Sequence, residues 1–305
     1  MKTRHINQFV GSVAVGVCLL VATEQRAQAG ELYRGWNYSI DSFIDGAGGS
    51  NYEIKGFAVT ETADSIYVAL TGGTPLTGTD SSDAVDGNIG WGDMFFNFSG
   101  KDFATAEAEG NLLGVRFAET NDSGLEQVGL FGNVTTKSVA FENNGYPSLK
   151  NYYDGGYNKA NTMGTDIATA DEAYSYLYGD DVAANPATDN TQTRNAINSG
   201  NFLGEINLLD STQLASRGLD FGNFSAKSSQ TFGFELDKSL LAEMLPSGIN
   251  SFMAHVFLEC LNDGVALAGN IDIPSERQDV PEPDGLLSLG FAGLAFLKFR
   301  KGRQE

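Results

Sequence analysis

Short runs of strand-forming residues, each bounded by turn-forming residues, recur along the middle of this 305-residue chain. Gly, Asn, Ser, Thr and aromatic residues are frequent and charged residues make up 19%, a mixture that favours short strands joined by turns over long helices. The strand-like runs are 33–40, 52–61, 65–70, 91–98, 112–117, 138–141, 231–236 and 252–259. No rhythm of strands alternating with longer helices indicates a parallel α/β sheet. The sequence therefore predicts an all-β fold, an antiparallel β-sandwich of jelly-roll-like form.

The run that begins at Phe252 and ends at Glu259 predicts a strand buried on both faces. Alternate residues from Phe252 onward are apolar, and the opposite face carries Met253, His255 and Phe257. Successive side chains of a strand point to opposite sides of the sheet, so both sides need a cover. A strand of this kind is typical of a sandwich interior.

A tyrosine-rich segment from Glu142 to Asn201 interrupts this pattern. It has few periodic apolar positions but carries seven of the 11 tyrosines. A structureless insertion of this length is unusual in a compact domain, so we expect elaborated loops with a short helix near 171–178. A second short helix is expected between Asp237, which can cap it, and Pro246, which ends it.

The tyrosines of this segment are the candidate ligand-binding residues. Tyrosine offers an apolar ring with a polar tip, which suits packing on sugar rings or on partner proteins. The alternative is that the rings hold the loops onto the sandwich. The candidates are Tyr152, Tyr153, Tyr157, Tyr174 and Tyr176, and the candidate partner is an extracellular polysaccharide.

Clustered carboxylates between Asp80 and Asp93 suggest calcium, the one cofactor that the sequence brings forward. Calcium takes six to eight oxygen ligands, and the candidates are Asp83, Asp86 and Asp93. The EF-hand register fails, because Gly87 at its sixth position places no acidic residue at the first or third. The alternative is an ordinary turn rich in Asp and Asn.

Charge and cysteine content exclude several classes of protein. The formal net charge is −20, whereas binding to a phosphate backbone needs clustered cations, so nucleic acid is not an expected partner. If residues 1–29 are removed as a leader, Cys260 is the single remaining cysteine. No intramolecular disulfide can then form, and a zinc site of the usual Cys and His kind lacks ligands.

The same removal leaves His255 as the single histidine. His255 and Glu259 lie four residues apart, and on a strand this puts them on one face about 13 Å from each other. They cannot share a proton directly, so we expect a buried, hydrogen-bonded histidine rather than a catalytic one. No spacing among the acidic residues singles out a glycosidase pair.

The N-terminus has the pattern of a secretory signal peptide. A basic start is followed by an apolar stretch from Phe9 to Ala22, and Ala27 and Ala29 supply the small residues that signal peptidase accepts before Gly30. The basic residues are Lys2, Arg4 and His5. We expect residues 1–29 to be removed by signal peptidase.

The C-terminus has the pattern of a processing and sorting signal. Its motif is Val280, Pro281, Glu282 and Pro283, and its basic tip is Lys298, Arg300, Lys301 and Arg303. The apolar run 285–297 between them would form a helix of about 20 Å, shorter than the roughly 30 Å core of a bilayer. It suits a transient anchor in the inner membrane, with the basic tip inside and the body outside.

The expected organisation is a β-sandwich at 30–274, a linker at 275–283 and the tail at 284–305.

These features together resemble those of PEP-CTERM proteins, a Gram-negative class whose C-terminal signal is recognised by an exosortase. Within that class, the body is similar to the XDD-type exosortase-dependent surface proteins of cyanobacteria. The residues that carry this likeness are Asp86, Gly87, Asn88, Ile89, Gly90, Trp91, Gly92, Asp93, Phe95, Phe96, Asn97, Phe98, His255, Glu259, Cys260, Asn262 and Asp263. The resemblance implies an exported surface protein, processed by an exosortase, and implies no enzyme chemistry.

The sequence therefore predicts a cell-surface or extracellular-matrix protein without enzymatic activity. Its processing partners are signal peptidase and exosortase. A lectin-like carbohydrate-binding module is the first alternative. A secreted hydrolase that depends on carboxylates is the second.

Overall fold

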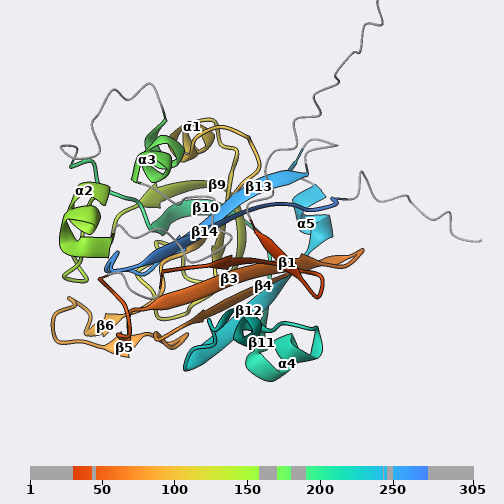
Figure 1. Cartoon of the computed structure of the whole chain (residues 1–305). Helices are drawn as coiled ribbons and strands as arrows, with labels where there is room; N and C mark the ends of the chain where they lie inside the picture. The colour runs from red at the N-terminus through yellow and green to blue at the C-terminus, as the bar shows by residue number, and fades with distance from the viewer. Residues whose placement is uncertain are drawn as a thin grey trace, which may run out of the picture.

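Two six-stranded antiparallel sheets that face each other form the centre of the molecule (Figure 1). The structure is a computed structural model, and it describes residues 30–42, 46–157, 170–179, 190–242, 244–245 and 250–273. The first sheet has the order β1 (Glu31–Tyr33), β2 (Trp36–Ile40), β3 (Ile54–Glu61), β4 (Ser65–Gly72), β12 (Gln230–Asp237), β11 (Asn207–Asp210). The second sheet has the order β10 (Ala196–Gly204), β9 (Gly129–Lys137), β8 (Leu112–Arg116), β7 (Met94–Asn97), β13 (Ser251–Phe257), β14 (Gly264–Asn270).

Short helices and a small hairpin complete the described residues. The hairpin pairs β5 (Thr79–Asp80) with β6 (Asn88–Ile89). The helices are α1 (Phe103–Ala108), α2 (Leu149–Tyr152) with a π-helical turn at Tyr153–Tyr157, α3 (Ala170–Tyr178), α4 (Ser211–Ser216) with a 3-10 helix at Phe221–Phe224, and α5 (Lys238–Ala242). They lie outside the two sheets (Figure 1).

The main hydrophobic core fills the space between the sheets. Alternate residues of β3, β4 and β12 enter it from the first sheet, and alternate residues of β7, β8, β13 and β14 enter it from the second. Phe57, Val68 and Phe234 on one side and Phe96 and Val256 on the other are at most 2% exposed. Burial of this apolar surface is the main term that holds the two sheets together.

Each sheet also has an apolar outer face with its own cover. The first outer face is covered by α4 and the 3-10 helix. Its residues are Trp36, Tyr38, Ile40, Ala58, Ala69, Leu209, Leu214, Leu219, Phe221 and Ala226. The second outer face is covered by α1, α2 and α3. Its residues are Phe95, Phe103, Ala106, Leu112, Phe131, Val134, Leu149, Ala173, Tyr174, Leu177, Tyr178 and Ile197. Strands buried on both faces follow from this arrangement, as the sequence predicts for β13.

The all-β, antiparallel prediction is confirmed, with local corrections. The run 33–40 is a hairpin rather than one strand, because Arg34 and Gly35 both adopt positive φ and turn the chain between β1 and β2. The run 138–141 is not a strand; it follows the end of β9, and the chain turns there through bonds such as Gly145 N–H to Ala140 O at 2.8 Å.

The strand order differs from that of a jelly roll. Consecutive strands are neighbours from β1 to β4 and again from β7 to β10, which is the order of two meanders, whereas a jelly roll is built from two Greek keys. The hairpins β11–β12 and β13–β14 then extend the two sheets next to β4 and β7. The jelly-roll part of the prediction is wrong because most pairs join strands that are consecutive in the chain.

The helix predictions are confirmed in part. The helix expected near 171–178 is α3, and the one expected after Asp237 is α5, which begins at Lys238. Pro246 lies outside the described residues. Among the described residues the sequence missed α1, α2 and α4, because each is at most six residues long and shows no helical period.

Candidate functional site

The glycine-rich chain before β7 and the chain after β13 lie side by side. Trp91 and Leu258 form an isolated antiparallel bridge. The N–H of Glu259 donates to the carbonyl of Gly90 at 3.0 Å. The two parts of the sequence that carry the family resemblance therefore meet in one place.

Glu259 joins this place to a third segment. Its side chain is buried, with 1% of the residue exposed. One carboxylate oxygen accepts the N–H of Gly90 at 2.6 Å, and the other accepts the N–H of Asp122 at 2.5 Å. The pKa of Glu259 is raised to about 8: burial is the main cause, the nearby charges of Asp122 and Asp86 add to it, and the two N–H donors oppose the shift.

Asp93 makes a second junction of the same kind, directly before β7. It is fully buried and accepts the N–H of Ile197 at 2.6 Å and the amide of Asn121 at 2.8 Å. Burial raises the pKa of Asp93 to about 6, and these donors, with Arg116 nearby, oppose the shift. Asp263 is a third example, since it accepts the N–H of Ile54 at 2.6 Å.

The predicted calcium ligands do not share one site. Asp93 is occupied by the bonds just described, whereas Asp83 and Asp86 are exposed in the turn between β5 and β6. Asp86 accepts the N–H of Asn88 at 2.9 Å, which is the turn geometry of the alternative interpretation. Among the described residues, no three His, Cys, Asp or Glu side chains are grouped so that they could hold a metal ion.

His255 lies on the second outer face, on the opposite side of the sheet from the main core. The residue is 1% exposed, and its Nδ1 lies 2.9 Å from the hydroxyl of Tyr176 on α3. Rings of Phe95, Phe103 and Phe257 surround it at centroid distances of 4.9 to 5.4 Å. Burial lowers the pKa of His255 to about 3. The expectation of a buried, hydrogen-bonded histidine is confirmed.

Three of the predicted tyrosine ligands, Tyr153, Tyr174 and Tyr176, pack on the second outer face, and Tyr152 packs against the ring of Tyr153. Tyr152 and Tyr174 are buried, and Tyr153 and Tyr176 are half-buried. The hydroxyl of Tyr176 is engaged with His255. This is the arrangement of the alternative interpretation, in which the rings hold the segment onto the sheet. The side chain of Tyr157 lies outside the described residues.

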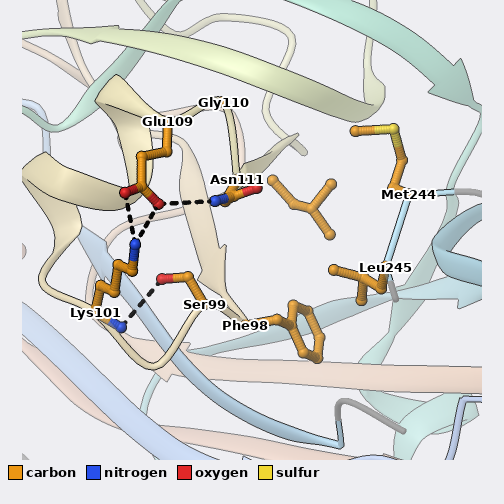
Figure 2. A pocket seen from close by; sticks show the side chains of 9 residues that line it. Phe98, Ser99, Lys101, Glu109, Gly110, Asn111, Met244 and Leu245 are labelled. Carbon is orange, nitrogen blue, oxygen red and sulfur yellow. Dashed lines mark hydrogen bonds and ion pairs between the residues drawn. The ribbon is translucent and has the colours of Figure 1, made fainter. Parts of the chain in front are cut away.

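One pocket lies between the two ends of α1 and the residues that follow α5 (Figure 2). It has a volume of about 180 Å³ and is lined by Phe98, Ser99, Lys101, Glu109, Gly110, Asn111, Leu113, Met244 and Leu245. Lys101 Nζ contacts the two carboxylate oxygens of Glu109 at 2.5 and 2.7 Å, and the amide of Asn111 donates to Glu109 at 3.1 Å. The charged groups of this pocket therefore satisfy each other.

A second pocket, which we call the loop-end pocket, lies beside the start of α2. It has a volume of about 500 Å³ and is lined by Phe141, Gly145, Tyr146, Pro147, Asn151, Asn190 and Gln192. Phe141 is 65% exposed. The strand expected at 138–141 includes Phe141, so the sequence did not indicate this pocket, although the Asn-Gly pair at 144–145 marks a turn.

The predicted signals at the two ends, 1–29 and 280–303, lie outside the described residues. Their processing therefore stays a prediction. Within the described part of the chain, no helix has the length and apolar character needed to cross a membrane.

The carboxylates Glu259, Asp93 and Asp263 therefore brace remote parts of the backbone, and the loop-end pocket combines aromatic rings with carboxamides. Comparison with known proteins adds no function to this geometry. No protein-family model, no curated protein and no solved structure matches the chain.

Proposed function

We propose that the chain is an exported protein of the cell surface or extracellular matrix, without enzymatic activity. It belongs to the XDD-type PEP-CTERM class, and signal peptidase and an exosortase process its ends. The C-terminal tail holds it in the inner membrane until that step. The motif from Val280 to Pro283, followed by an apolar run and a basic tip, is the observation that carries the proposal.

The use of the buried carboxylates supports a structural role. Glu259, Asp93 and Asp263 each accept backbone N–H groups from distant segments. A carboxylate held in this way stabilises a loop, whereas a hydrolase needs two that face a common substrate. His255 is enclosed by aromatic rings and neutral above pH 3, which suits packing better than proton transfer.

Mass spectrometry of the protein recovered from cell-surface material tests this proposal. The expected N-terminal residue is Gly30, and the expected C-terminal peptide ends near Pro283. Replacement of Pro281 and Pro283 by Ala should leave the tail attached, whereas Pro274→Ala, a matched change just before the linker, should not. Recovery of the unmodified protein from the cytosol with Glu305 still attached would contradict the proposal.

The second candidate function is lectin-like binding of an extracellular polysaccharide. The observation that favours it is the loop-end pocket, in which the exposed ring of Phe141 lies beside carboxamide side chains. Tyr153, Tyr174 and Tyr176 do not carry this candidate, because they pack on the second outer face.

A further inference from the structure

We propose that the loop-end pocket is a binding site for a neutral polysaccharide. The inference rests on the carbohydrate-binding role just described, and it is independent of how the chain ends are processed. The pocket volume of about 500 Å³ falls within the range of about 300–1,000 Å³ that is usual for ligand sites.

The apolar wall of the pocket suits the C–H face of a sugar ring. It consists of Phe141, Tyr146 and Pro147, and flat rings of this kind pack against apolar faces with little loss of conformational freedom. Val85, which is 84% exposed, lies on a neighbouring loop. The backbone N–H of Val85 donates to the carbonyl of Glu142 at 2.8 Å and so joins that loop to the one that carries Phe141. The two most exposed large apolar side chains among the described residues are thus on adjacent loops.

The polar wall supplies hydrogen-bonding groups without charge. Asn151, Asn190 and Gln192 each carry a carboxamide, which both donates and accepts and so matches a hydroxyl. The hydroxyl of Ser148 donates to the carboxamide oxygen of Asn151 at 2.8 Å and fixes its orientation. The amide nitrogen of Asn151, with two N–H donors, is the group suited to reach a sugar hydroxyl.

Backbone bonds make the two sides of the pocket rigid. The N–H of Thr193 donates to the carbonyl of Pro147 at 2.9 Å, and Ser148 and Gln192 form an antiparallel bridge. The N–H of Tyr146 donates to the carbonyl of Cys260 at 2.9 Å and ties the aromatic wall to the chain after β13. A preformed site loses less entropy when it binds a flexible chain.

The charge of the site and of the protein selects a neutral ligand. None of the described residues that line the loop-end pocket is charged, in contrast to the Lys101 and Glu109 pair of the other pocket. The net charge of −20 repels polyanions. Acidic polysaccharides are therefore expected to bind weakly.

The pocket also lies at the end of the sandwich opposite to where the described chain ends. α2, beside the pocket, and α5 are at opposite ends (Figure 1). The chain near Asp272 is beside α5, because the N–H of Asp272 and the ammonium of Lys238 both contact Glu61. A molecule held by its C-terminal tail would present the pocket away from the membrane.

Affinity electrophoresis of the full-length protein in mild detergent tests this inference. Separate native gels contain a soluble β-glucan, a galactomannan or alginate. The dissociation constant is obtained from the decrease in protein mobility as the polysaccharide concentration in the gel increases. We expect at least one neutral polysaccharide to retard the protein and alginate to leave it unretarded. Phe141→Ala and Gln192→Ala should each weaken binding about tenfold, the usual size for a central contact. Phe202→Ala, a control at an exposed phenylalanine on β10, should leave binding unchanged.

The outcomes separate the site from the role. Retardation by no neutral polysaccharide overturns both the binding role and the site, whereas retardation that Phe141→Ala and Gln192→Ala leave unchanged overturns the site alone. An equal loss in Phe202→Ala also overturns the site, since it shows an effect that is not local. Unchanged circular dichroism and melting temperature in the variants show that any loss is not a loss of fold.

Discussion

The two apolar outer faces of the sandwich are shielded from water by different kinds of cover. The first outer face is covered by α4 and the 3-10 helix, which lie within 20 residues of each other in the chain, and Tyr38 packs against Phe221 and Phe224 at 5.4 and 4.8 Å between ring centroids. The second outer face is covered by helices from distant parts of the sequence, and it encloses the imidazole of His255. The first face is thus apolar packing with few buried polar groups, whereas the second contains a group that can gain a proton.

The two covers should therefore differ in their sensitivity to solution conditions. Apolar packing responds to volume and temperature but not to pH. A buried neutral histidine opposes protonation, so acid weakens the structure around it. The two covers should therefore fail under different stresses.

Trp36→Ala is expected to have the largest effect, on the first outer face. Trp36 is fully buried, and its indole N–H donates to the carbonyl of Arg217 at 3.0 Å. The cavity and the lost bond should lower the free energy of unfolding by about 4 kcal/mol, or the melting temperature by about 10 °C. Leu32→Ala, at a residue 59% exposed on β1, is the control and should change stability by less than about 0.5 kcal/mol. Equal losses in the two variants would contradict the assignment of the first outer face as packed core.

Acid is expected to open the second outer face before the first. Unfolded histidine has a pKa near 6.5 and folded His255 a pKa of about 3, so its stabilising contribution is complete above pH 6.5 and falls as the pH drops toward 3. One proton changes the free energy of unfolding by up to about 1.4 kcal/mol per pH unit, or about 2 kcal/mol between pH 6.5 and 5. The groups that face the imidazole are aromatic rings and the hydroxyl of Tyr176, and the cation of Arg194 lies 5.6 Å over the Phe103 ring. None of these groups carries a negative charge that could pair with an imidazolium and offset its desolvation.

Hydrogen exchange of backbone amides is the suitable measurement for this prediction. A global melting curve would mix the effect with Glu259 and Asp93, whose pKa values are raised to about 8 and about 6. Those groups contribute in the opposite direction, because a raised carboxyl pKa lowers stability as the pH rises through it. Protection in α3 should fall at pH 5 while protection in α4 persists, and His255→Gln should remove the difference. Loss of protection in both helices at the same pH would count against it.

Two tyrosine hydroxyls offer a matched test of intermediate size. The hydroxyl of Tyr176 is the partner of His255 Nδ1, and Tyr176→Phe leaves that buried nitrogen unpaired, at a cost of about 2 kcal/mol. The hydroxyl of Tyr38 accepts the N–H of Asp220 at 2.9 Å, and this half-buried N–H can bind water after Tyr38→Phe. We expect a loss of about 1 kcal/mol or less there. Urea midpoints with unchanged slopes measure both, and a larger loss for Tyr38→Phe would reverse the comparison of the two faces.

The contrast between the faces also shows what a single sequence reveals of the fold. The double burial of β13 is predicted from alternation, and α3 from its local pattern. In contrast, β10 contains Asn198, Ser199, Gly200 and Asn201, is largely exposed, and shows register shifts against β9. No apolar alternation marks such an edge strand, so its conformation is set by pairing with β9 and not by its own residues.

Of the buried hydrogen bonds that join remote segments, only the carboxylate acceptors could be predicted from the sequence. Asp93 and Glu259 attract notice as acidic residues in turn-rich segments. Their donors, the N–H groups of Ile197 and Asp122, lie 104 and 137 residues away in the sequence. A backbone N–H has no residue signature, so spacing could not distinguish a brace from a metal ligand. Phe141 and Gln192 likewise meet only through the tertiary fold.

Helix caps provide the smallest and most local comparison of the two covers. Asp210 and Gln213 form a capping box at the start of α4, with bonds of 2.8 and 2.9 Å, and Asp102 accepts the N–H of Thr105 at 2.8 Å at the start of α1. Asp210→Ala and Asp102→Ala should each cost about 1 kcal/mol, while Asp210→Asn, which keeps a capping oxygen, should cost less. Because α1 packs against α3 and α4 packs on the first sheet, exchange after Asp102→Ala should rise in both α1 and α3. After Asp210→Ala the rise should be confined to α4, and a rise that spreads equally in both variants would show that the two covers are coupled through the core.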